Sequence, residues 1–441
     1  MCKGPGGFSL PEDSMALADL IIRAAKEADE TEVYISSGRQ ISAELKRNLI
    51  GISSGGESLG IAIRIVKDNR IGASSTNNPG MWRECLDAAV ESARFADTQE
   101  WGGMPGQAEL KAGIHTHDPD FVISADCAEG LIEDLLCGAD EYPSADVAGG
   151  GASLSYGEIS IANTSGAGYS MKRTLASASL EAIREQSTGY EFDTTVNIRD
   201  LDPRKTGEKA AFLASESHGA GEIETGRYDV ILSPLAASEL VGGIVSSALS
   251  GKNLHAGRSY FDGKLGETVT DERLSIYDDP HSDSTGCSPF DADAVPTRVN
   301  RFISGGVLES FAYDMKTAYR YGEETTGNAT RSGPGGAPAI GMHNLKIEGA
   351  RGDQMAGRGV LVHSVVGAHT ANPLTGDFSV ELSNAFVVDD GTFEMPVRSA
   401  MLSGNVFSML KETACLGTDD RNIGNMTFPS IRFNNLHIIG K

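Results

Sequence analysis

The chain has 441 residues, and this length favours two or three domains over a single core. Apolar residues make up 40% of it, enough for globular domains, and the 53 glycines indicate many turns and closely approaching strands. The formal net charge of −24 would repel a phosphate backbone, so we expect no nucleic-acid partner.

The cysteines and the apolar runs bear on the cellular compartment. The cysteines lack the C-x-x-C spacing of zinc knuckles and give no disulfide framework. Residues 1–15 contain no apolar signal core, and no run approaches the roughly 18 apolar residues of a membrane span. We therefore expect a cytoplasmic protein with no membrane partner and with reduced thiols at Cys2, Cys85, Cys127, Cys137, Cys287 and Cys415.

Residues 1–106 are predicted to form an N-terminal α+β domain. Apolar residues recur at helical spacing over residues 15–28 and 81–96. The turn-rich residues 101–106 are the expected linker to the next domain. Between the two helices, alternating or β-rich runs predict strands at residues 31–36, 39–46, 60–66 and 70–76.

Residues 107–220 are predicted to form a central α+β domain. Helical patterns cover residues 125–142 and 205–217. The remaining pattern alternates strand and turn, which predicts antiparallel pairing of strands at residues 149–156, 158–163, 169–184 and 189–192.

Residues 221–441 are predicted to form a C-terminal β-rich domain that opens on a strand at residues 228–232. Ser233 then supplies a helix N-cap, and Pro234 suits the first helical turn. The helix that follows has two apolar rows at four-residue spacing, so we expect it to face the core. The rows are Leu240, Ile244 and Ala248, and Val241, Val245 and Leu249.

Strands separated by turns dominate the rest of the sequence, and only residues 406–412 have a helical pattern there. Such a run is typical of a large antiparallel, barrel-like sheet. The predicted fold class is therefore α+β: two units of antiparallel sheet and helices, followed by a large, mostly antiparallel β domain. Its strands are expected at residues 274–277, 301–303, 306–311, 344–348, 359–363, 378–382, 386–388, 397–402 and 431–438.

Several phrases of the sequence are specific in combination. Residues 259–267 read Ser-Tyr-Phe-Asp-Gly-Lys-Leu-Gly-Glu, and Asp278, Asp279 and Pro280 close the next strand. Together with residues 57–64, 321–328, 370–379 and 401–405, these phrases resemble the TldD/PmbA family over nearly the whole chain. The resemblance implies a peptidase family in which one subunit type carries a His-Glu-x-x-x-His zinc motif on the helix after Pro234.

The three motif positions fall, without gaps, on Gly242, Gly243 and Ser247. A second register over residues 238–243 also lacks both histidines. Zinc needs N, S or O ligands at roughly 2.0–2.3 Å, and such a peptidase needs a carboxylate to take the proton of the metal-bound water. We therefore predict no catalytic residue, metal site or cofactor in this chain, which resembles the metal-free PmbA (TldE) branch.

The resemblance also implies a cysteine ligand near residues 422–425 in the zinc-bearing branch. No cysteine occurs there, and the nearest, Cys415, precedes the turn at residues 417–419. Two histidine pairs are interpreted without a metal: His115 and His117 as a solvated loop, and His363 and His369 as sheet residues with no acid or thiol at ligand spacing.

Glycine- and asparagine-rich phrases supply candidate contact residues. Residues 370–379 favour a tight turn through hydrogen bonds from side chain to backbone. We expect this turn either to line a peptide groove or partner surface or to do no more than close a hairpin. The candidates for the groove or interface are Gly327, Asn328, Asn372, Thr375, Gly376 and Asp377.

The resemblance implies that the chain is a PmbA/TldE-like subunit of a TldD/TldE-type zinc metalloprotease that degrades or processes small or unfolded peptides. The Zn would lie in a TldD-like paralogue that forms a heterodimer with this chain, and this chain would be the non-catalytic partner. The alternative is a homodimeric peptide-binding module without protease activity. No Gly-x-Ser-x-Gly, P-loop or dinucleotide motif supports another enzyme class.

Overall fold

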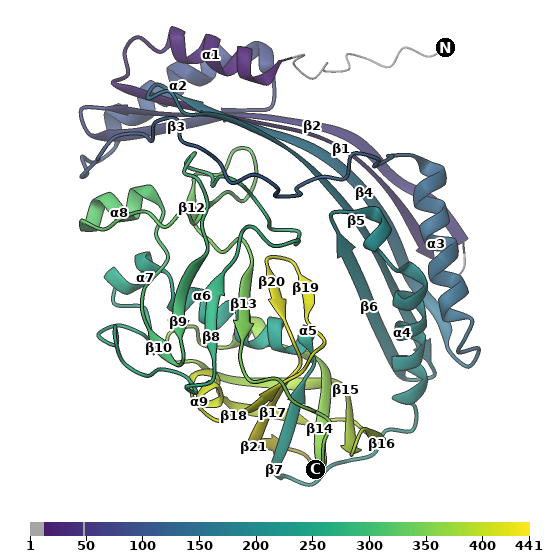
Figure 1. The fold of residues 1–441 in the computed structure, drawn as a ribbon. Coiled ribbons are helices and arrows are strands. Elements are labelled where there is room, and N and C mark those ends of the chain that lie inside the picture. Colours follow the sequence, from purple (N-terminus) through teal and green to yellow (C-terminus); the bar gives the residue numbers. More distant parts are fainter. Residues whose placement is uncertain (1–12, 47–48) are drawn as a thin grey trace.

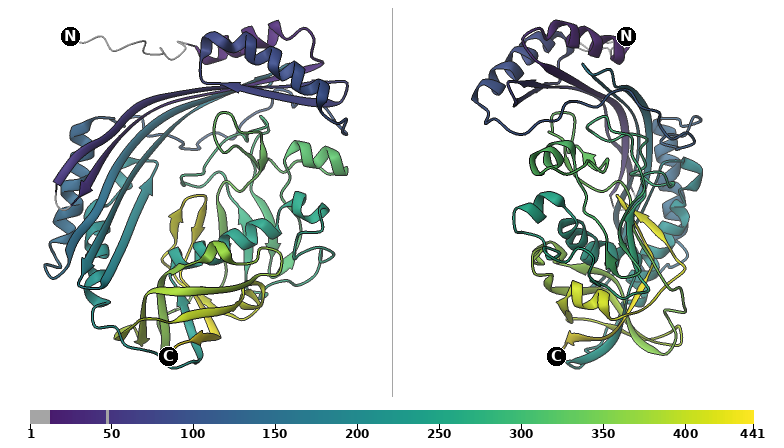
Figure 2. Two further views of the ribbon diagram at one scale, coloured as in Figure 1. Left: turned by 180° about the vertical axis from the view of Figure 1, so that it is seen from behind. Right: turned by 60° about the vertical axis from the view of Figure 1, so that its left-hand side comes forward.

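A computed structural model describes residues 13–46 and 49–441 of the chain. A long, curved six-stranded sheet arches over the C-terminal half, which lies on its concave side (Figures 1 and 2). The strand order is β3-β2-β1-β4-β5-β6, and all neighbours are antiparallel. The strands are β1 Glu30–Lys46, β2 Leu49–Lys67, β3 Arg70–Thr76, β4 Asp146–Asn163, β5 Gly168–Arg184 and β6 Ser187–Thr195.

Helices cover the convex face of this sheet in two pairs (Figure 1). At one end, α1 and α2 pack on the strands through a core that contains Ile21, Leu86 and Ile63. At the other end, α3 and α4 pack through a second core around Leu135 and Leu180. The helices are α1 Ser14–Ala24, α2 Trp82–Phe95, α3 Ala125–Ala139 and α4 Pro203–Glu216.

The two predicted N-terminal units share one sheet, because β1 pairs with β2 on one side and with β4 on the other. The sequence predicted two separate strands in the place of β1 and two in the place of β4, but each of these is one continuous strand. Gly38 of β1 lies opposite Gly157 of β4, so both strands continue through their glycines. Pairing over the full length of each strand outweighs the local turn signal, since each broken ladder would leave backbone groups unpaired.

The C-terminal domain contains a closed barrel, in which β14, β7, β21, β17 and β15 pair in turn and β15 returns to β14. Only the β7–β14 pair of this ring is parallel. The prediction of an α+β fold with a barrel-like C-terminal domain is therefore confirmed. The strands are β7 Gly226–Leu232, β14 Arg358–Val366, β15 Asp377–Asp389, β17 Met401–Asn405 and β21 Ile431–Ile439, with β16 Thr392–Val397 and β18 Thr413–Leu416 attached.

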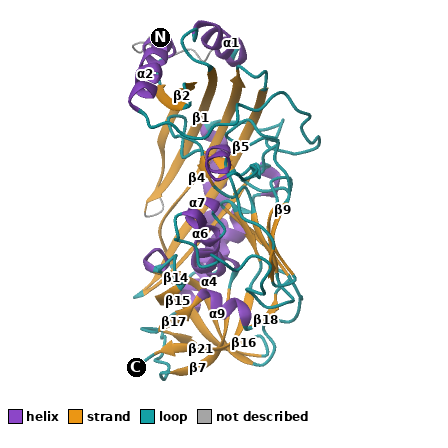
Figure 3. Cartoon of the chain, turned by 90° about the vertical axis from the view of Figure 1, so that its left-hand side faces the viewer, coloured by secondary structure: helices purple, strands orange, loops and turns teal. Residues whose placement is uncertain are grey.

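A second six-stranded sheet, ordered β10-β9-β8-β13-β20-β19, completes the domain, which consists mainly of strands and loops (Figure 3). The sheet and the barrel share one large apolar core. Its strands are β8 Ser275–Asp278, β9 Asn300–Ser304, β10 Val307–Leu308, β13 Leu345–Glu348, β19 Arg421–Ile423 and β20 Met426–Phe428, and a separate hairpin joins β11 Ala329–Thr330 to β12 Ala339–Ile340.

The expectation of a single helix in the last part of the chain is wrong. The expected helix is present as α9 Val406–Lys411, but α8 Met315–Tyr321 precedes it. Asp314 caps α8 by accepting a hydrogen bond from Thr317 N, and Gly322 ends it with a φ of 72°. These seven residues are too short for a periodic apolar pattern to reveal the helix.

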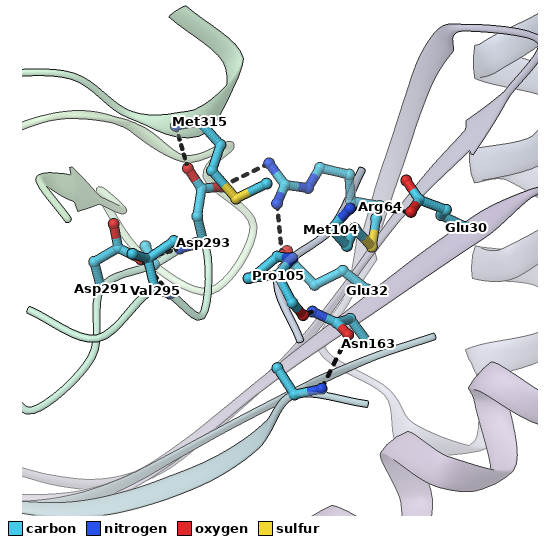
Figure 4. Close-up of polar contacts among 12 residues, drawn as sticks. Glu30, Glu32, Arg64, Met104, Pro105, Asn163, Asp291, Asp293, Val295 and Met315 are labelled. Carbon is cyan, nitrogen blue, oxygen red and sulfur yellow. Dashed lines mark hydrogen bonds and ion pairs between the residues drawn. The ribbon is translucent and has the colours of Figure 1, made fainter. Parts of the chain in front are cut away.

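Buried ion pairs join the long sheet to the C-terminal domain (Figure 4). Arg64 of β2 bonds Glu32 of β1 at 2.5 Å and Asp293 at 2.8 Å, and Arg331 bonds Glu32 at 2.6 Å. The exposed fraction of each of these side chains is at most 7%. The same figure shows Glu30, which accepts a hydrogen bond from Met104 N at 3.0 Å, so the predicted linker is docked on the sheet.

Candidate functional site

The helix that follows β7 lies in the core of the C-terminal domain. Ser233 caps it by accepting a hydrogen bond from Ala236 N at 3.2 Å, as predicted. The helical run consists of α5 Pro234–Ala237, a π-helical turn at Ser238–Gly242 and α6 Gly243–Ala248. Both predicted apolar rows are buried, which confirms that this helix faces the core. A π turn inside an α-helix is rare and often marks a functional site.

The three motif positions on this helix have different surroundings. A Cβ atom at Gly242 would lie 2.1 Å from the sulfur of Met426 in β20, so the Met426 side chain already fills that space. Gly243 is exposed and has nothing within 4 Å of such an atom. Ser247 accepts a hydrogen bond from Asn253 Nδ2 at 3.0 Å. One hydroxyl and a thioether do not provide the donor set that zinc requires, so the residues here do not fit that metal.

The cysteine ligand position that the resemblance implies, near residues 422–425, lies at the turn between β19 and β20. Asn422 donates to the backbone oxygen of Asp283 at 3.1 Å, and Asn425 donates to that of Met342 at 3.1 Å. Both amides therefore bond backbone groups. Within residues 13–46 and 49–441, no three His, Cys, Asp or Glu side chains lie close enough to hold a metal ion.

The candidate contact residues separate into two groups. Asn328 is fully buried, where its side chain donates to Asp278 at 2.7 Å and accepts from Asn300 at 3.0 Å. Gly327 precedes it with a φ of 72°, and its carbonyl oxygen lies 3.0 Å from His343 Nε2. These two residues belong to a polar network inside the domain.

The other four candidates form one turn at the surface. Asn372 accepts hydrogen bonds from Leu374 N and Thr375 N, and Asp377 accepts from Thr375 and Asn405 side chains. Gly376 has a φ of 83°, and a Cβ atom there would lie 2.5 Å from the Phe407 ring. The turn is therefore rigid, and its Asn, Thr and Asp side chains remain exposed.

The two histidine pairs occupy different environments. The His115 side chain is 78% exposed and lies 3.8 Å from Asp283. His369 is also exposed, whereas His363 on β14 is buried. The structure thus separates the members of the second pair and places His363 in a cavity that the sequence did not predict.

This cavity, here called the α4 cavity, has a volume of about 720 Å³ and lies between α4, the edge strand β6 and the outside of the barrel. Its lining includes Glu191 of β6, Lys209 and Phe212 of α4, His363, Phe393 of β16 and Arg421 of β19. Segments far apart in the sequence contribute these residues, so no short motif could reveal them. A lone histidine inside an apolar strand was the one available signal.

Charged groups of the α4 cavity influence one another. Arg421 bonds Glu191 at 2.7 Å. Burial lowers the pKa of His363 to about 4, and the Glu191 charge only partly offsets this. Burial also lowers the pKa of Lys209. The imidazole of His363 is therefore neutral at pH 7.

The free energy of unfolding should fall more steeply with acidification in the unmodified protein than in a His363→Gln variant. Between pH 6.5 and about 4 the unfolded chain binds a proton at His363 and the folded chain does not, so stability is lost as the pH falls through this window. The loss reaches about 3 kcal/mol at pH 4. Urea denaturation at several pH values measures it. Other titrating groups cancel in the comparison, and equal slopes for both proteins would contradict the prediction.

Three family models match the chain in order. PmbA/TldA metallopeptidase domain 1 matches residues 31–96, the central domain matches residues 123–217, and the C-terminal domain matches residues 225–440. An uncharacterized protein of Methanocaldococcus jannaschii is 30% identical over 95% of this chain and 99% of its own length. A protein named metalloprotease in Methanothermobacter thermautotrophicus is 25% identical over 93% and 92%.

A solved structure extends the comparison to three dimensions. The crystal structure of TldE from Thermococcus kodakarensis is similar with a TM-score of 0.88 and 26% identity, over 96% of this chain and all of that chain. The family matches cover both N-terminal units and the barrel domain. The chain therefore belongs to the PmbA/TldD metallopeptidase family.

Proposed function

We propose that this chain is the metal-free, non-catalytic subunit of a zinc peptidase that acts on small or unfolded peptides. A zinc-bearing relative of the same architecture supplies the metal and the carboxylate base. This chain completes the assembly and helps to enclose the peptide. Both subunits work in the cytoplasm. Among the described residues, no helix combines the length and the apolar character that a membrane span requires.

The packing at Gly242 is the observation that carries this proposal. Any side chain at position 242 would meet the sulfur of Met426 at 2.1 Å and the Phe428 ring at 3.7 Å. A thioether and a phenyl ring next to this position create an apolar environment, which disfavours a bound divalent cation and its charged ligands. Neither Gly242 nor Gly243 offers a ligand or a base.

The relatives support the peptidase assignment. Proteins named metalloprotease, PmbA homolog and TldD homolog match this chain, and the similar solved structure is that of TldE from Thermococcus kodakarensis. The only acid on the motif helix, Glu239, accepts a hydrogen bond from Val365 N at 3.0 Å and has no histidine beside it on that helix. A zinc-activated water therefore requires ligands from another chain.

The test is metal analysis combined with co-purification. The purified chain alone should hold well under one zinc per chain and should leave unfolded peptides intact. Mixed with a tagged relative that carries His-Glu-x-x-x-His, it should co-purify, and the mixture should hold zinc and cleave the peptides. The relative alone and the mixture with EDTA are the controls.

Two outcomes contradict the proposal. Stoichiometric zinc and peptide cleavage by the chain alone would show that it carries its own site. Failure to associate with any zinc-bearing relative, together with a stable homodimer that binds peptides without cleaving them, would favour the alternative of a peptide-binding module.

A further inference from the structure

The α4 cavity has an aromatic side. Phe212 of α4 contacts Phe393 of β16 edge to face, with ring centroids 5.9 Å apart, and Phe393 contacts Phe386 of β15 at 5.0 Å. All three rings line the cavity. Its volume of about 720 Å³ lies in the range of roughly 300–1,000 Å³ that is typical of small-ligand sites. An apolar group of aromatic size therefore fits against this side.

The inner charged groups of the cavity carry two positive charges, Arg421 and Lys209, for the one negative charge of Glu191. Arg421 and Glu191 neutralise each other at 2.7 Å. Among the described residues, no carboxylate lies within 4.0 Å of the Lys209 ammonium, which instead lies 4.7 Å from the centre of the Phe212 ring. A half-buried ammonium in such a position attracts an anionic group.

Among the described residues, none of the remaining acidic side chains of the lining forms an ion pair with Lys209, although the Glu208 charge raises the pKa of Lys209. Asp202 caps α4 by accepting from Lys205 N at 3.0 Å, and Asp419 accepts from the Ser430 hydroxyl at 2.5 Å. Glu208 is exposed on α4, and Asp193 accepts from Thr194 N at 2.8 Å. These carboxylates are bonded elsewhere or lie in solvent at the rim.

His363 presents an unsatisfied nitrogen to the same cavity. Its side chain is only 8% exposed, and Nε2 has no hydrogen-bond partner among the described residues, although Glu191 Oε2 lies 3.5 Å away. A hydrogen bond with the backbone of Tyr190 raises the pKa of His363, and because Nε2 has no partner we assign this bond and the single imidazole proton to the other ring nitrogen. Nε2 is then an acceptor that lacks a donor, and leaving it so is costly in a buried site.

We propose that the α4 cavity binds a residue with a large apolar side chain and a free α-carboxylate. The carboxylate of this residue pairs with Lys209, and the N–H group on the same α-carbon donates to His363 Nε2. The apolar side chain packs against Phe212 and Phe393. The C-terminal residue of a peptide and a free amino acid share this chemistry. The site lies at the start of the motif helix, about 12 Å along it from Gly242, and the inference does not depend on the proposed function.

Calorimetric titration of the full chain tests the site without any mutation. The probe is a hexapeptide that ends in phenylalanine with a free carboxylate, and its twin carries a C-terminal amide. Amidation should weaken binding at least about tenfold, because it removes a charge-assisted hydrogen bond. Equal affinities for acid and amide, or no binding of either at millimolar concentration, would overturn the proposal.

Matched variants identify the group that reads the carboxylate. Lys209→Met should bind acid and amide equally, whereas Lys205→Met, one turn earlier on α4 and exposed, should keep the tenfold difference. If Lys209→Met kept the full tenfold difference between acid and amide, the pairing of the carboxylate with Lys209 would be overturned. Free phenylalanine is the third probe. If its affinity lies within about tenfold of that of the hexapeptide, the ligand is a free amino acid. If it binds at least about a hundredfold more weakly, the ligand is the C-terminal end of a peptide. Zinc content and co-purification do not enter these measurements, so the site and the proposed function fail separately.

Discussion

Replacing Arg64 by methionine is expected to lower the free energy of unfolding by about 3–5 kcal/mol. The Arg64 guanidinium bonds both Glu32 and Asp293, and neither carboxylate is more than 1% exposed. Without it, Glu32 keeps Arg331 as its partner, but Asp293 keeps only hydrogen bonds such as that from Met315 N. An anion that is buried without a counterion accounts for most of the expected loss. Urea denaturation measures it.

Arg199 provides the matched control for this experiment. It pairs with Asp120 at a similar distance of 2.8 Å, but the two side chains are 73% and 68% exposed. Arg199→Met should change stability by less than about 1 kcal/mol, since solvent screens exposed ion pairs. If Arg64→Met were as mild as this control, the buried ion pairs would not be what joins the long sheet to the C-terminal domain.

Replacing Asn328 by leucine is expected to cost about 3–5 kcal/mol, because it leaves at least two buried polar groups without partners at about 1–3 kcal/mol each. Asn328 donates to Asp278 at 2.7 Å and to Gly341 O at 3.2 Å, and its oxygen accepts from Thr326 at 2.7 Å. Burial already raises the pKa of Asp278, and removing a donor should raise it further. Thermal and urea denaturation measure the loss.

Asn372→Ala is the control, because Asn372 is exposed and only organises its own turn. It should cost about 1 kcal/mol or less. Peptide binding by the folded variants then separates a structural role from a contact role. A stable Asn328→Leu protein with weakened peptide binding would show that Asn328 lines a groove, contrary to its burial here.

Local sequence patterns were sufficient to predict the helix after Pro234 and the barrel-like domain, where each element packs one face against one core. The two apolar rows after Pro234 predicted a buried helix, and Ser233 predicted its cap, because helical periodicity and capping depend on residues a few positions apart. Alternation in the later strands likewise predicted a barrel-like domain. The glycines at positions 242 and 243 exclude ligand side chains whatever the fold.

Other features depend on residues that are distant in the sequence. The continuity of β1 follows from its pairing with β2 and β4 on either side, which overrides the turn signal at Gly38. The burial of Asn328 and the α4 cavity arise where separate segments meet, and the sequence contains no pattern that links Lys209 to His363. The sequence by itself determined the fold class, the buried helix that Ser233 caps and the side chains that stand at the motif positions, since these depend on local chemistry. Only the tertiary structure decided which polar groups are buried together, because burial and charge pairing depend on long-range contacts.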